Sequence, residues 1–435
     1  MADVRPFRAL RYNAERADPS RTIAPPYDVI SPEQQASLYA RSEYNIVRVE
    51  YGEQWASDTE SDSRYTRAAR DLDVWRAGGV LVRDATPAIY VYEQQFEWED
   101  RRHERTAYFA AVRLEEWDKG IIKPHEHTLS GPKADRLDLL RATRTQVSPV
   151  YSLFRSKGSS RSAFSSADFA GASELLYAFE ADGQRHALSA LRDAGRLRAF
   201  ADHLAASDVY IADGHHRYET ALTYRNECRA RASSWTGEEP ENFVLMALTD
   251  AADPGLLVLP THRLLSPPRF PADALDQLAR HFSIVDVTQR GLTELTRLLA
   301  STPHNVARFG AIGLASGSAQ VLTLEDRHAI EKMMPADQPA SWKRLDVSVL
   351  QYGILAPIFG IDDAVLMAGG AVSYTQDASA AADAVASSTA RAAFILNATP
   401  VDHVLAVADE GARMPQKSTY FYPKLPTGLV LNSLD

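Results

Sequence analysis

The segment DVYIADG, residues 208–214, constrains the fold most strongly, because it leads directly into a segment of different periodicity. Its continuous apolar run is typical of a short buried strand. From His215 onward, the sequence HHRYETALTYRNECRA places apolar residues at helical spacing. Strands that alternate with helices are the pattern of α/β proteins. We therefore predict an α/β chain in which Gly214 forms the turn between a strand and a helix.

The start of this predicted helix carries residues that suit an anion. The first backbone N–H groups of a helix have no acceptor within the helix, and the helix dipole is positive there. Gly214 lets a ligand approach the backbone closely, and His215, His216 and Arg217 follow it directly. The simpler interpretation is that Asp213 caps the helix while the other side chains are solvated. We favour a phosphate-binding site, because the imidazole and guanidinium donors are concentrated at one helix start.

A second candidate site lies in the segment KPHEHT. There Glu126 stands between His125 and His127. A carboxylate flanked by two imidazoles can be held ionised by its neighbours and can act as a base. The alternative interpretation of this segment is a polar surface loop.

Three further basic residues suit an anionic substrate. Lys133 and Arg136 lie three positions apart, so they share one face if the segment is helical. Lys417 lies near the end of the chain, beside two hydroxyl residues in the segment MPQKSTYFYPK. Lys417, Ser418 and Thr419 could close over a phosphate. The alternative is that this segment is a tail whose aromatic residues pack on the fold. We expect Arg136 and Lys417 to reach the same pocket as Arg217.

A metal-binding interpretation competes for some of these residues. His125 and His127 alternate as they would on a strand, and Asp213, His215 and His216 could add ligands. Zinc sites do use histidine and carboxylate ligands, but the chain has no HExxH motif and a single cysteine. We therefore expect no dedicated catalytic metal site. Magnesium that arrives with a nucleotide fits better, because it binds through few carboxylates and through phosphates.

Several functional classes are disfavoured by the sequence. It contains no GxxxxGK[ST], no GxGxxG that opens a helix after a strand, and no GxSxG, the commonest nucleotide, dinucleotide and hydrolase motifs. The net charge of −10 argues against nucleic acid as a partner. No apolar stretch approaches the length of a membrane-spanning helix, and the N-terminus has no apolar signal region. One cysteine excludes an internal disulfide, so we expect a cytoplasmic protein.

The remaining sequence predicts a chain with two parts. The first, residues 1–265, would contain a strand over 45–51, a helix over 65–75, a hairpin of 88–96 with 106–114, and a helix over 186–206. The second, residues 266–435, alternates helix-like and strand-like segments, such as ALDQLARHF, SIVDV and LTELTRLLA. The proline-rich segment LLSPPRFPAD marks the boundary.

Several long segments together resemble one bacterial family. They are APPYDVI, NIVRVE, KPHEHT with GPKADRL, SPVYSLF, ADGHHRYETA and MPQKSTYFYPKLPTGLV, and they extend from Pro25 to Val430 in the family's order. The chain is identified as a member of the family of domain of unknown function 1015. This family is similar to the free serine kinase branch of the ParB/sulfiredoxin superfamily. The resemblance implies a mixed-sheet, ParB/sulfiredoxin-like nucleotide-binding core in the first part, with a C-terminal α/β portion that helps to close the site.

The resemblance also implies roles for individual residues. GHHRYETA is similar to the helix-start motif with which the superfamily holds nucleotide phosphates, which assigns Gly214 to Arg217 to the phosphates. KPHE is similar to the box whose glutamate is the base for the substrate hydroxyl, which assigns Glu126 as the base and Asp213 as its partner at the substrate or metal. Magnesium with ATP or ADP is the implied cofactor. Position 215 is histidine where sulfiredoxin has its cysteine, so sulfinic acid repair is disfavoured.

Three functional hypotheses follow. The first is a nucleotide-dependent phosphotransferase acting on a small hydroxyl compound, with serine or phosphoserine as the substrate. The second is a phosphate-ester hydrolase in which water replaces the acceptor. The third is a regulatory protein that binds a nucleotide without turnover. All three predict a nucleotide or a phosphorylated small molecule as the partner.

Overall fold

The computed structural model describes residues 1–127, 130–156, 172–303 and 305–435. The chain forms two compact units, each assembled from separated stretches of sequence. Unit 1 comprises Met1–Pro124, Thr128–Leu256 and Pro423–Asp435, and unit 2 comprises His125–His127 and Leu257–Tyr422. Both units contain helices and strands, so the predicted α/β class is confirmed. The predicted division of the chain into residues 1–265 and 266–435 stays a prediction.

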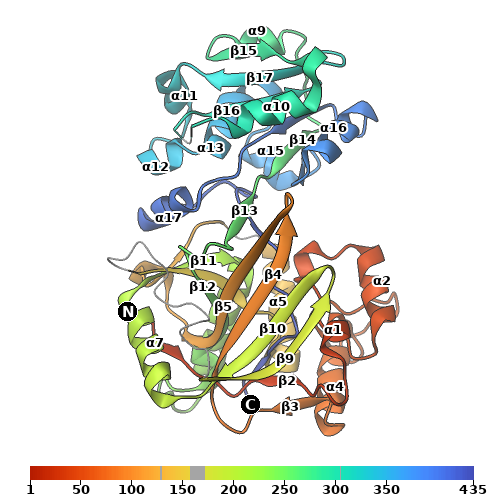
Figure 1. Ribbon diagram of the computed structural model, residues 1–435, viewed down its shortest axis with the longest axis vertical. Coiled ribbons are helices and arrows are strands. Elements are labelled where there is room, and N and C mark those ends of the chain that lie inside the picture. Colours follow the sequence, from red (N-terminus) through yellow and green to blue (C-terminus); the bar gives the residue numbers. More distant parts are fainter. Residues whose placement is uncertain (128–129, 157–171, 304) are drawn as a thin grey trace. The chain divides into compact units, whose positions relative to one another are not determined.

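Unit 1 is built on a nine-stranded sheet in which parallel and antiparallel pairs are mixed (Figure 1). The predicted mixed sheet is therefore confirmed. The strands follow one another in the order β6 (Ile122–Pro124), β11 (Asp208–Asp213), β8 (Val150–Arg155), β12 (Phe243–Asp250), β5 (Arg101–Arg113), β4 (Ile89–Trp98), β10 (Gln184–Leu191) and β9 (Ser173–Ala181), with β1 (Val4–Arg5) paired to β5.

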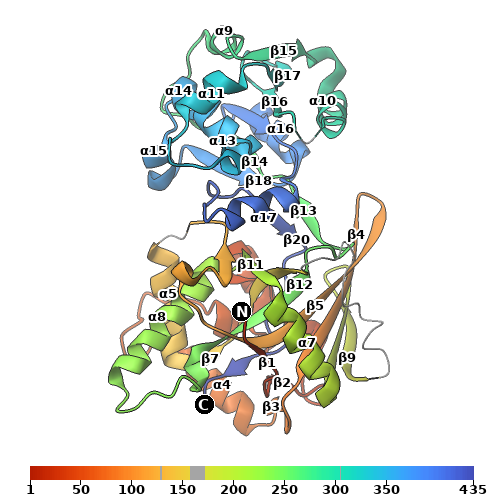
Figure 2. The same ribbon diagram turned by 90° about the vertical axis from the view of Figure 1, so that its left-hand side faces the viewer.

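Helices and short strand pairs surround this sheet. Two of the helices, α5 (Ser130–Thr143) and α8 (His215–Arg231), lie side by side (Figure 2). The other described helical elements of unit 1 are α1 (Pro19–Thr22), η1 (Tyr27–Val29), α2 (Pro32–Arg41), α3 (Val47–Glu50), α4 (Arg64–Ala77), η2 (Trp117–Lys119), α7 (Ala194–Ala206) and η3 (Pro240–Asn242). The short pairs are β2 (Leu10–Tyr12) with β3 (Leu81–Arg83) and β7 (Thr145–Gln146) with β21 (Asn432–Ser433).

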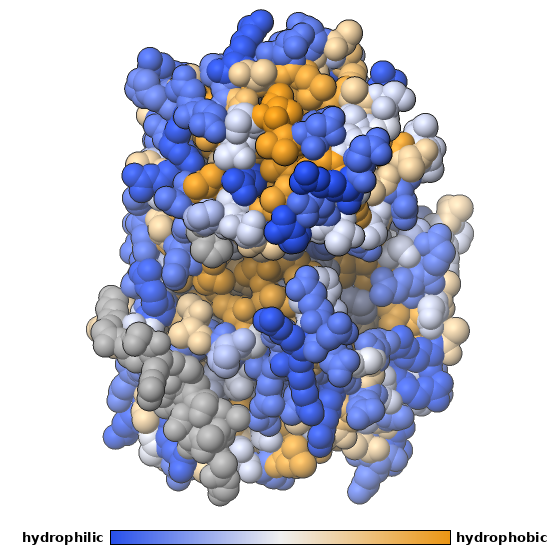
Figure 3. All heavy atoms as spheres, turned by 45° about the horizontal axis from the view of Figure 1, so that its top comes forward, coloured by the Kyte–Doolittle hydropathy of each residue, from blue (hydrophilic) through white to orange (hydrophobic). Residues whose placement is uncertain are grey.

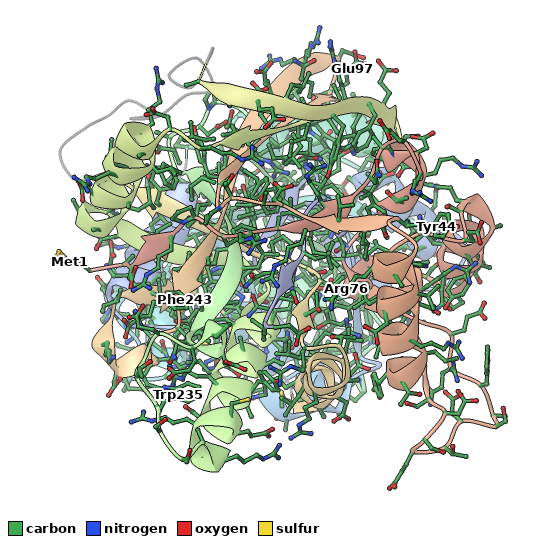
Figure 4. The ribbon with its side chains drawn as sticks, turned by 90° about the horizontal axis from the view of Figure 1, so that it is seen from below. Met1, Tyr44, Arg76, Glu97, Trp235 and Phe243 are labelled. Carbon is green, nitrogen blue, oxygen red and sulfur yellow. The ribbon has the colours of Figure 1, made fainter. Side chains whose placement is uncertain are left out.

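The end of the chain is part of unit 1. β21 pairs antiparallel with β7. Arg76, at the end of α4, donates hydrogen bonds to Thr145 Oγ1 at 3.1 Å and Ser433 Oγ at 3.2 Å (Figure 4). Tyr177 on β9 adds a hydrogen bond to the carbonyl of Leu429. These contacts fix the C-terminal segment of unit 1, which begins at Pro423 and contributes to the site described below.

The sequence-based predictions succeed where local signals are strong. The helix predicted over 65–75 is α4, which begins after a capping box formed by Ser63 and Thr66 and ends before Gly78. The predicted hairpin is β4 with β5. The predicted strand and helix around Gly214 are β11 and α8.

The predicted strand over residues 45–51 is wrong, because this segment contains the helix α3. Ile46, Val47, Val49 and Glu50 are all buried. Alternation of apolar and charged residues indicates a strand only when one face is exposed to water. Here neighbouring as well as alternate residues are buried, and the Asn45 side chain accepts a hydrogen bond from the backbone N–H of Val47, which starts the helical turn.

The predicted single helix over residues 186–206 is also wrong. Its first part is β10, in which His186, Leu188 and Ala190 are buried while the residues between them are partly exposed. This is the period of two that a strand requires. The helix α7 begins only after Asp193, whose side chain caps it by accepting a hydrogen bond from the backbone N–H of Arg196.

Unit 2 contains a six-stranded sheet whose neighbouring strands are all antiparallel. The order is β15 (Phe282–Asp286), β17 (Ala319–Leu324), β16 (Arg308–Ile312), β19 (Ala392–Ile395), β14 (His262–Leu265) and β18 (Val372–Thr375), and a separate pair joins β13 (Leu257–Leu259) to β20 (Tyr420–Tyr422).

Apolar residues on the two faces of this sheet belong to two separate clusters. Ala392 and Phe394 of β19 join the larger cluster, while Ala393 and Ile395 join the smaller one. Because side chains alternate along a strand, the sheet has a buried layer on each face. The smaller cluster includes residues of α10 (Gly291–Ala300) and α16 (Ala378–Ala386). The other described helical elements of unit 2 are α9 (Ala274–Leu278), η4 (Thr288–Arg290), α11 (Arg327–Met333), α12 (Ala340–Lys343), α13 (Asp346–Leu350), a π-helical turn (Gln351–Leu355), α14 (Ala356–Phe359), α15 (Asp363–Ala368) and α17 (Val401–Asp409).

Hydrophilic side chains cover most of the face drawn in Figure 3, and apolar side chains gather in smaller patches between them. Among the helices that the structure describes, none is both long enough and apolar enough to cross a membrane.

Candidate functional site

The turn between β11 and α8 forms the centre of the candidate site in unit 1. Gly214 adopts a left-handed conformation, with φ 89° and ψ 29°, and stands at the N-cap of α8. A glycine has no side chain with which to cap the helix. The first backbone N–H groups of a helix have no acceptor within the helix itself. The predicted arrangement of strand, glycine turn and helix start is therefore present. We call Asp213 to Arg217 the cradle.

The guanidinium group of Arg217 folds back over the glycine of the cradle. A Cβ atom on Gly214 would lie 2.8 Å from Arg217 Nε and 2.9 Å from its Cζ. Arg217 Nη2 donates to Asp213 Oδ2 at 2.7 Å, and Nη1 donates to the carbonyl oxygen of Pro149. Glycine at position 214 is thus favoured by its positive φ, and a side chain there would have to displace this flexible guanidinium.

Lys424 completes the cradle from the far end of the sequence. Its Nζ donates a hydrogen bond to Asp213 Oδ1 at 2.7 Å. Burial would raise the pKa of Asp213, but the charges of Lys424 and Arg217 outweigh it and hold that pKa well below its usual range. Asp213 is therefore ionised between two cations, and the three side chains together carry one net positive charge.

The two histidines of the cradle differ in their surroundings. His215 is 5% exposed and belongs to the buried side of α8. His216 is partly buried, and burial lowers its pKa against the opposing effects of Glu219 and Asp28. A lowered pKa favours the neutral imidazole near pH 7, which can donate or accept a hydrogen bond.

The basic residues predicted on the preceding helix lie on α5, against α8. Lys133 Nζ forms an ion pair with Glu219 Oε2 at 3.0 Å. Arg136 is 6% exposed and donates to the backbone carbonyl of Glu50 at 2.7 Å and to the carboxylate of Asp135 at 2.5 Å. Its guanidinium also lies 4.0 Å from the ring centre of Tyr27. Arg136 is thus held by a set of buried partners beside the cradle.

A small cavity lined by both apolar and charged residues lies beside Arg217 in unit 1. Its volume is about 50 Å³, which is room for water. Glu50 lies on its wall and accepts a hydrogen bond from Ser148 Oγ at 2.6 Å. Burial raises the pKa of Glu50, against the lowering effect of Arg136. Arg136 and Arg217 both line this cavity, and the sequence did not indicate Glu50 as their neighbour.

The remaining predicted residues belong to unit 2. Residues 125–127 pair with the segment that contains Lys417: the backbone N–H of Met414 donates to the carbonyl of His125 at 2.7 Å, and that of Lys417 donates to Glu126 Oε1 at 2.6 Å. Lys417 has φ 56°, an uncommon conformation for a residue with a side chain. The backbone N–H at position 417 thus orients the Glu126 carboxylate.

The side chains of these residues have different exposures. His125 is buried, and its Nε2 lies 3.1 Å from Thr419 Oγ1. His127 and Lys417 are exposed. Thr128, which ends the KPHEHT segment, lies outside the described residues.

Sequence reasoning missed a buried arginine near Glu126. Arg263, on β14, is 5% exposed and donates to the carbonyl oxygen of Lys417 at 3.1 Å. Burial lowers its pKa to about 10, and Tyr374 and Glu126 oppose this shift. No recognisable motif surrounds Arg263 in the segment HRLL, so the local sequence did not indicate it as a site residue. Lys424 could have been found, since it lies in the same quoted C-terminal segment as Lys417.

Within the described ranges, no three histidine, cysteine, aspartate or glutamate side chains are grouped as metal ligands. The cradle also does not fit a metal at Asp213, because each of its carboxylate oxygens lies 2.7 Å from a cationic nitrogen. The predicted role of Asp213 toward a substrate stays a prediction.

Comparison with solved structures finds similarity to free serine kinase in complex with AMP, at 11% identity and a TM-score of 0.36, covering 74% of this chain and 91% of that chain. A mutant of free serine kinase in complex with ADP gives the same identity and TM-score, with 92% of that chain covered. A conserved hypothetical protein from Pyrococcus furiosus shows 11% identity and a TM-score of 0.34, with coverage of 74% and 94%.

No curated protein sequence matches this chain. The family model described as "Protein of unknown function (DUF1015)" matches residues 4–348 of the 435. This match confirms the family that the sequence motifs indicated. The chain therefore belongs to the DUF1015 family.

Proposed function

We propose that this protein is a nucleotide-dependent phosphotransferase that acts on a small hydroxyl compound, with serine as the acceptor. The observation that carries the proposal is the cradle: a left-handed glycine at the start of a 17-residue helix, with Arg217 and Lys424 held on Asp213. Oriented backbone N–H groups and paired cations at a helix start are a general solution for binding phosphates.

The charges of the cradle support phosphate binding rather than proton transfer. Asp213 stays ionised far below neutral pH, so it is a poor general base near pH 7. Its role in the proposal is to position Arg217 and Lys424, whose positive charges exceed its own. Phosphoryl transfer depends mostly on such positioning and charge neutralisation.

Glu126 is the proposed base, as the resemblance of KPHE to the kinase box implies. Its Oε1 accepts the backbone N–H of Lys417, which orients the carboxylate. In the reaction, the acceptor oxygen forms a bond to the terminal phosphorus of the nucleotide while the bond to the bridging oxygen breaks. The hydroxyl proton passes to Glu126, and the shortened nucleotide leaves with the electron pair.

ATP or ADP is the proposed phosphoryl donor, and magnesium would accompany it. When bound, the metal neutralises charge on the phosphates. Asp213 is not its ligand in this proposal, because both carboxylate oxygens are already held by cations.

The test combines binding and turnover. Unfolding of the wild-type protein would be followed against ATP, ADP and CTP with magnesium, with and without serine or phosphoserine. A nucleotide at about 100 times its Kd adds about 2.7 kcal/mol of stability if it binds the folded state alone. We expect one adenine nucleotide to stabilise the protein, and serine to increase the effect.

Turnover would then be measured for Glu126→Gln and for the control Glu325→Gln, an exposed glutamate of the same unit. We expect E126Q to bind the nucleotide but to lose phosphoserine formation, and E325Q to match the wild type. Full turnover by E126Q would refute its role as the base. Phosphate release from phosphoserine without any nucleotide would favour the hydrolase, and nucleotide binding without turnover would favour the regulatory protein.

A further inference from the structure

Arg105, on β5, is a buried cation of unit 1 to which the proposed function gives no role. Its side chain is almost completely covered, with 1% of the residue exposed. Its Nη2 donates hydrogen bonds to the side-chain oxygen of Gln94 and, at 2.8 Å, to the carbonyl oxygen of Pro423. Among the described residues, its Nε and Nη1 have no hydrogen-bond partner. Buried donors without partners destabilise a fold, so a contribution to the site would account for this arginine.

The backbone around Arg105 is held on both sides. β5 pairs with β4 through this region. On the other side, the backbone N–H of Thr106 donates a hydrogen bond to Asp253 Oδ2 at 3.1 Å. Gly255 packs so closely on the strand that a Cβ atom there would lie 1.9 Å from the carbonyl oxygen of Glu104. The strand therefore gives the long side chain of Arg105 a fixed base.

The carbonyl group that Arg105 binds belongs to the peptide unit between Pro423 and Lys424. A peptide unit is planar and contains the Cα atoms of both its residues, so a hydrogen bond to its carbonyl also restricts the second Cα. Pro423 begins the C-terminal stretch of unit 1, and its ring fixes its own φ. A lysine ammonium group stands on a flexible carbon stem, and a fixed Cα limits the positions that it can reach. Arg105 thus restricts where the ammonium group of Lys424 lies.

Arg105 also contacts the neighbour of Asp213 in the sheet. Its guanidinium carbon lies 5.2 Å from the ring centre of Tyr151. Tyr151, on β8, is the residue that pairs with Asp213 of β11. The hydrogen bond from Lys424 to Asp213 therefore has Arg105 beside it twice, at Pro423 on the side of the lysine and at Tyr151 on the side of the aspartate.

We infer that Arg105 is a positioning residue of the cradle, which holds Lys424 within hydrogen-bond reach of Asp213. This inference rests on the proposed function, in which the cradle binds phosphates. Without Arg105, the Pro423–Lys424 peptide unit is free to turn, and the ammonium group of Lys424 leaves its place beside the carboxylate. Loss of Arg105 should then weaken phosphate binding as much as loss of the Lys424 charge itself.

The test is a double-mutant cycle of Arg105→Met and Lys424→Met, with the Kd for ADP measured by isothermal titration calorimetry. We expect each single variant to raise this Kd about 10-fold, the lower end of the range for a charge-assisted hydrogen bond. The double variant should bind ADP no more weakly than K424M, because Arg105 acts through Lys424. The control Arg67→Met removes another buried arginine of unit 1, which donates to the carbonyl of Glu53 at 2.8 Å, and should keep the wild-type Kd.

Three results would overturn the inference: wild-type affinity in R105M, an equal loss of affinity in R67M, or single effects that multiply to about 100-fold in the double variant. Arg105→Gln replaces R105M in the cycle if the methionine variant does not fold. A wild-type protein that binds no ADP overturns the proposed function instead. Urea unfolding then decides the inference: K424M should shift the unfolding midpoint less in the R105M background than in the wild type, and equal shifts would overturn it.

Discussion

The ammonium group of Lys424 lies 2.7 Å from Oδ1 of Asp213, a residue 211 positions earlier in the chain. Oδ2 of the same carboxylate lies 2.7 Å from Nη2 of Arg217. Asp213 therefore joins one cation from its own helix start and one from the C-terminal segment. This triad sets the charge of the cradle, and the C-terminal segment is needed to complete it.

Replacing Lys424 with methionine should weaken phosphate binding by the cradle. The substitution removes a charge-assisted hydrogen bond, which is worth about 1.5–3 kcal/mol, and makes the three side chains neutral overall. The expected result is a Kd for ADP raised by about 10-fold or more, measured by isothermal titration calorimetry. The control is Lys119→Met, which removes an exposed lysine paired with Glu115. Equal affinities of the two variants would show that Lys424 has only a structural role.

Gly214→Ala should disturb the cradle through two separable effects. A left-handed conformation costs an alanine about 1 kcal/mol, and the new Cβ would lie 2.8 Å from Arg217 Nε. Gly120→Ala is the matched control, because Gly120 has φ 60° and open space around its Cβ position. We expect G120A to lower the free energy of unfolding by about 1 kcal/mol with no effect on ADP binding. G214A should lose both more stability and ADP binding; retained binding would contradict a close fit of Arg217 over the turn.

Arg136→Met should destabilise unit 1 strongly. It would leave the buried carboxylate of Glu50 without its cationic partner. Removal of one partner from a buried ion pair lowers the free energy of unfolding by about 3–5 kcal/mol. The control on the same helix is Arg141→Met, an exposed ion pair with Glu227, for which we expect less than about 1 kcal/mol. Urea unfolding measures both. The double variant E50Q/R136M should recover part of the loss, and no recovery would mean that Arg136 acts through its other partners, the carboxylate of Asp135 and the ring of Tyr27.

The stability of unit 2 should depend on pH through Asp346. Burial raises the pKa of this carboxyl from 3.8 to about 7, against the lowering effect of Arg327. Because the folded-state pKa is the higher one, the stabilisation by the protonated form is complete below pH 3.8 and is lost as the pH rises through about 7. Asp346→Asn stays neutral, so above pH 7 it should be more stable than the wild type by on the order of 2–4 kcal/mol.

This prediction is checked by urea unfolding at several pH values between 4 and 8. The control, Asp276→Asn, changes an exposed carboxylate of α9 and should follow the wild-type pH dependence. An unchanged pH profile in D346N would show that Asp346 is ionised in the folded protein at neutral pH.

The local order of residues was enough to predict the centre of the candidate site. The apolar run 209–212, the glycine at 214 and the periodicity after it are short-range signals, and the strand, turn and helix formed as expected. The same holds for α4, where the cap and the terminating glycine are close in sequence. Predictions from periodicity failed at α3 and at β10, because the burial of neighbouring residues and a change of element at Asp193 are not visible in a local pattern.

By itself the sequence determined the family, the α/β class and the residues of the glycine turn, since each depends on neighbouring residues or on ordered motifs. Only the tertiary structure decided which charges meet. Lys424 reaches Asp213, Arg136 stacks on Tyr27, and Arg263 binds the carbonyl of Lys417, all across more than a hundred residues of sequence. Such contacts depend on how strands are ordered in a sheet and on which segments return to it. Electrostatic energies fall with distance in space, which separation along the chain does not reveal.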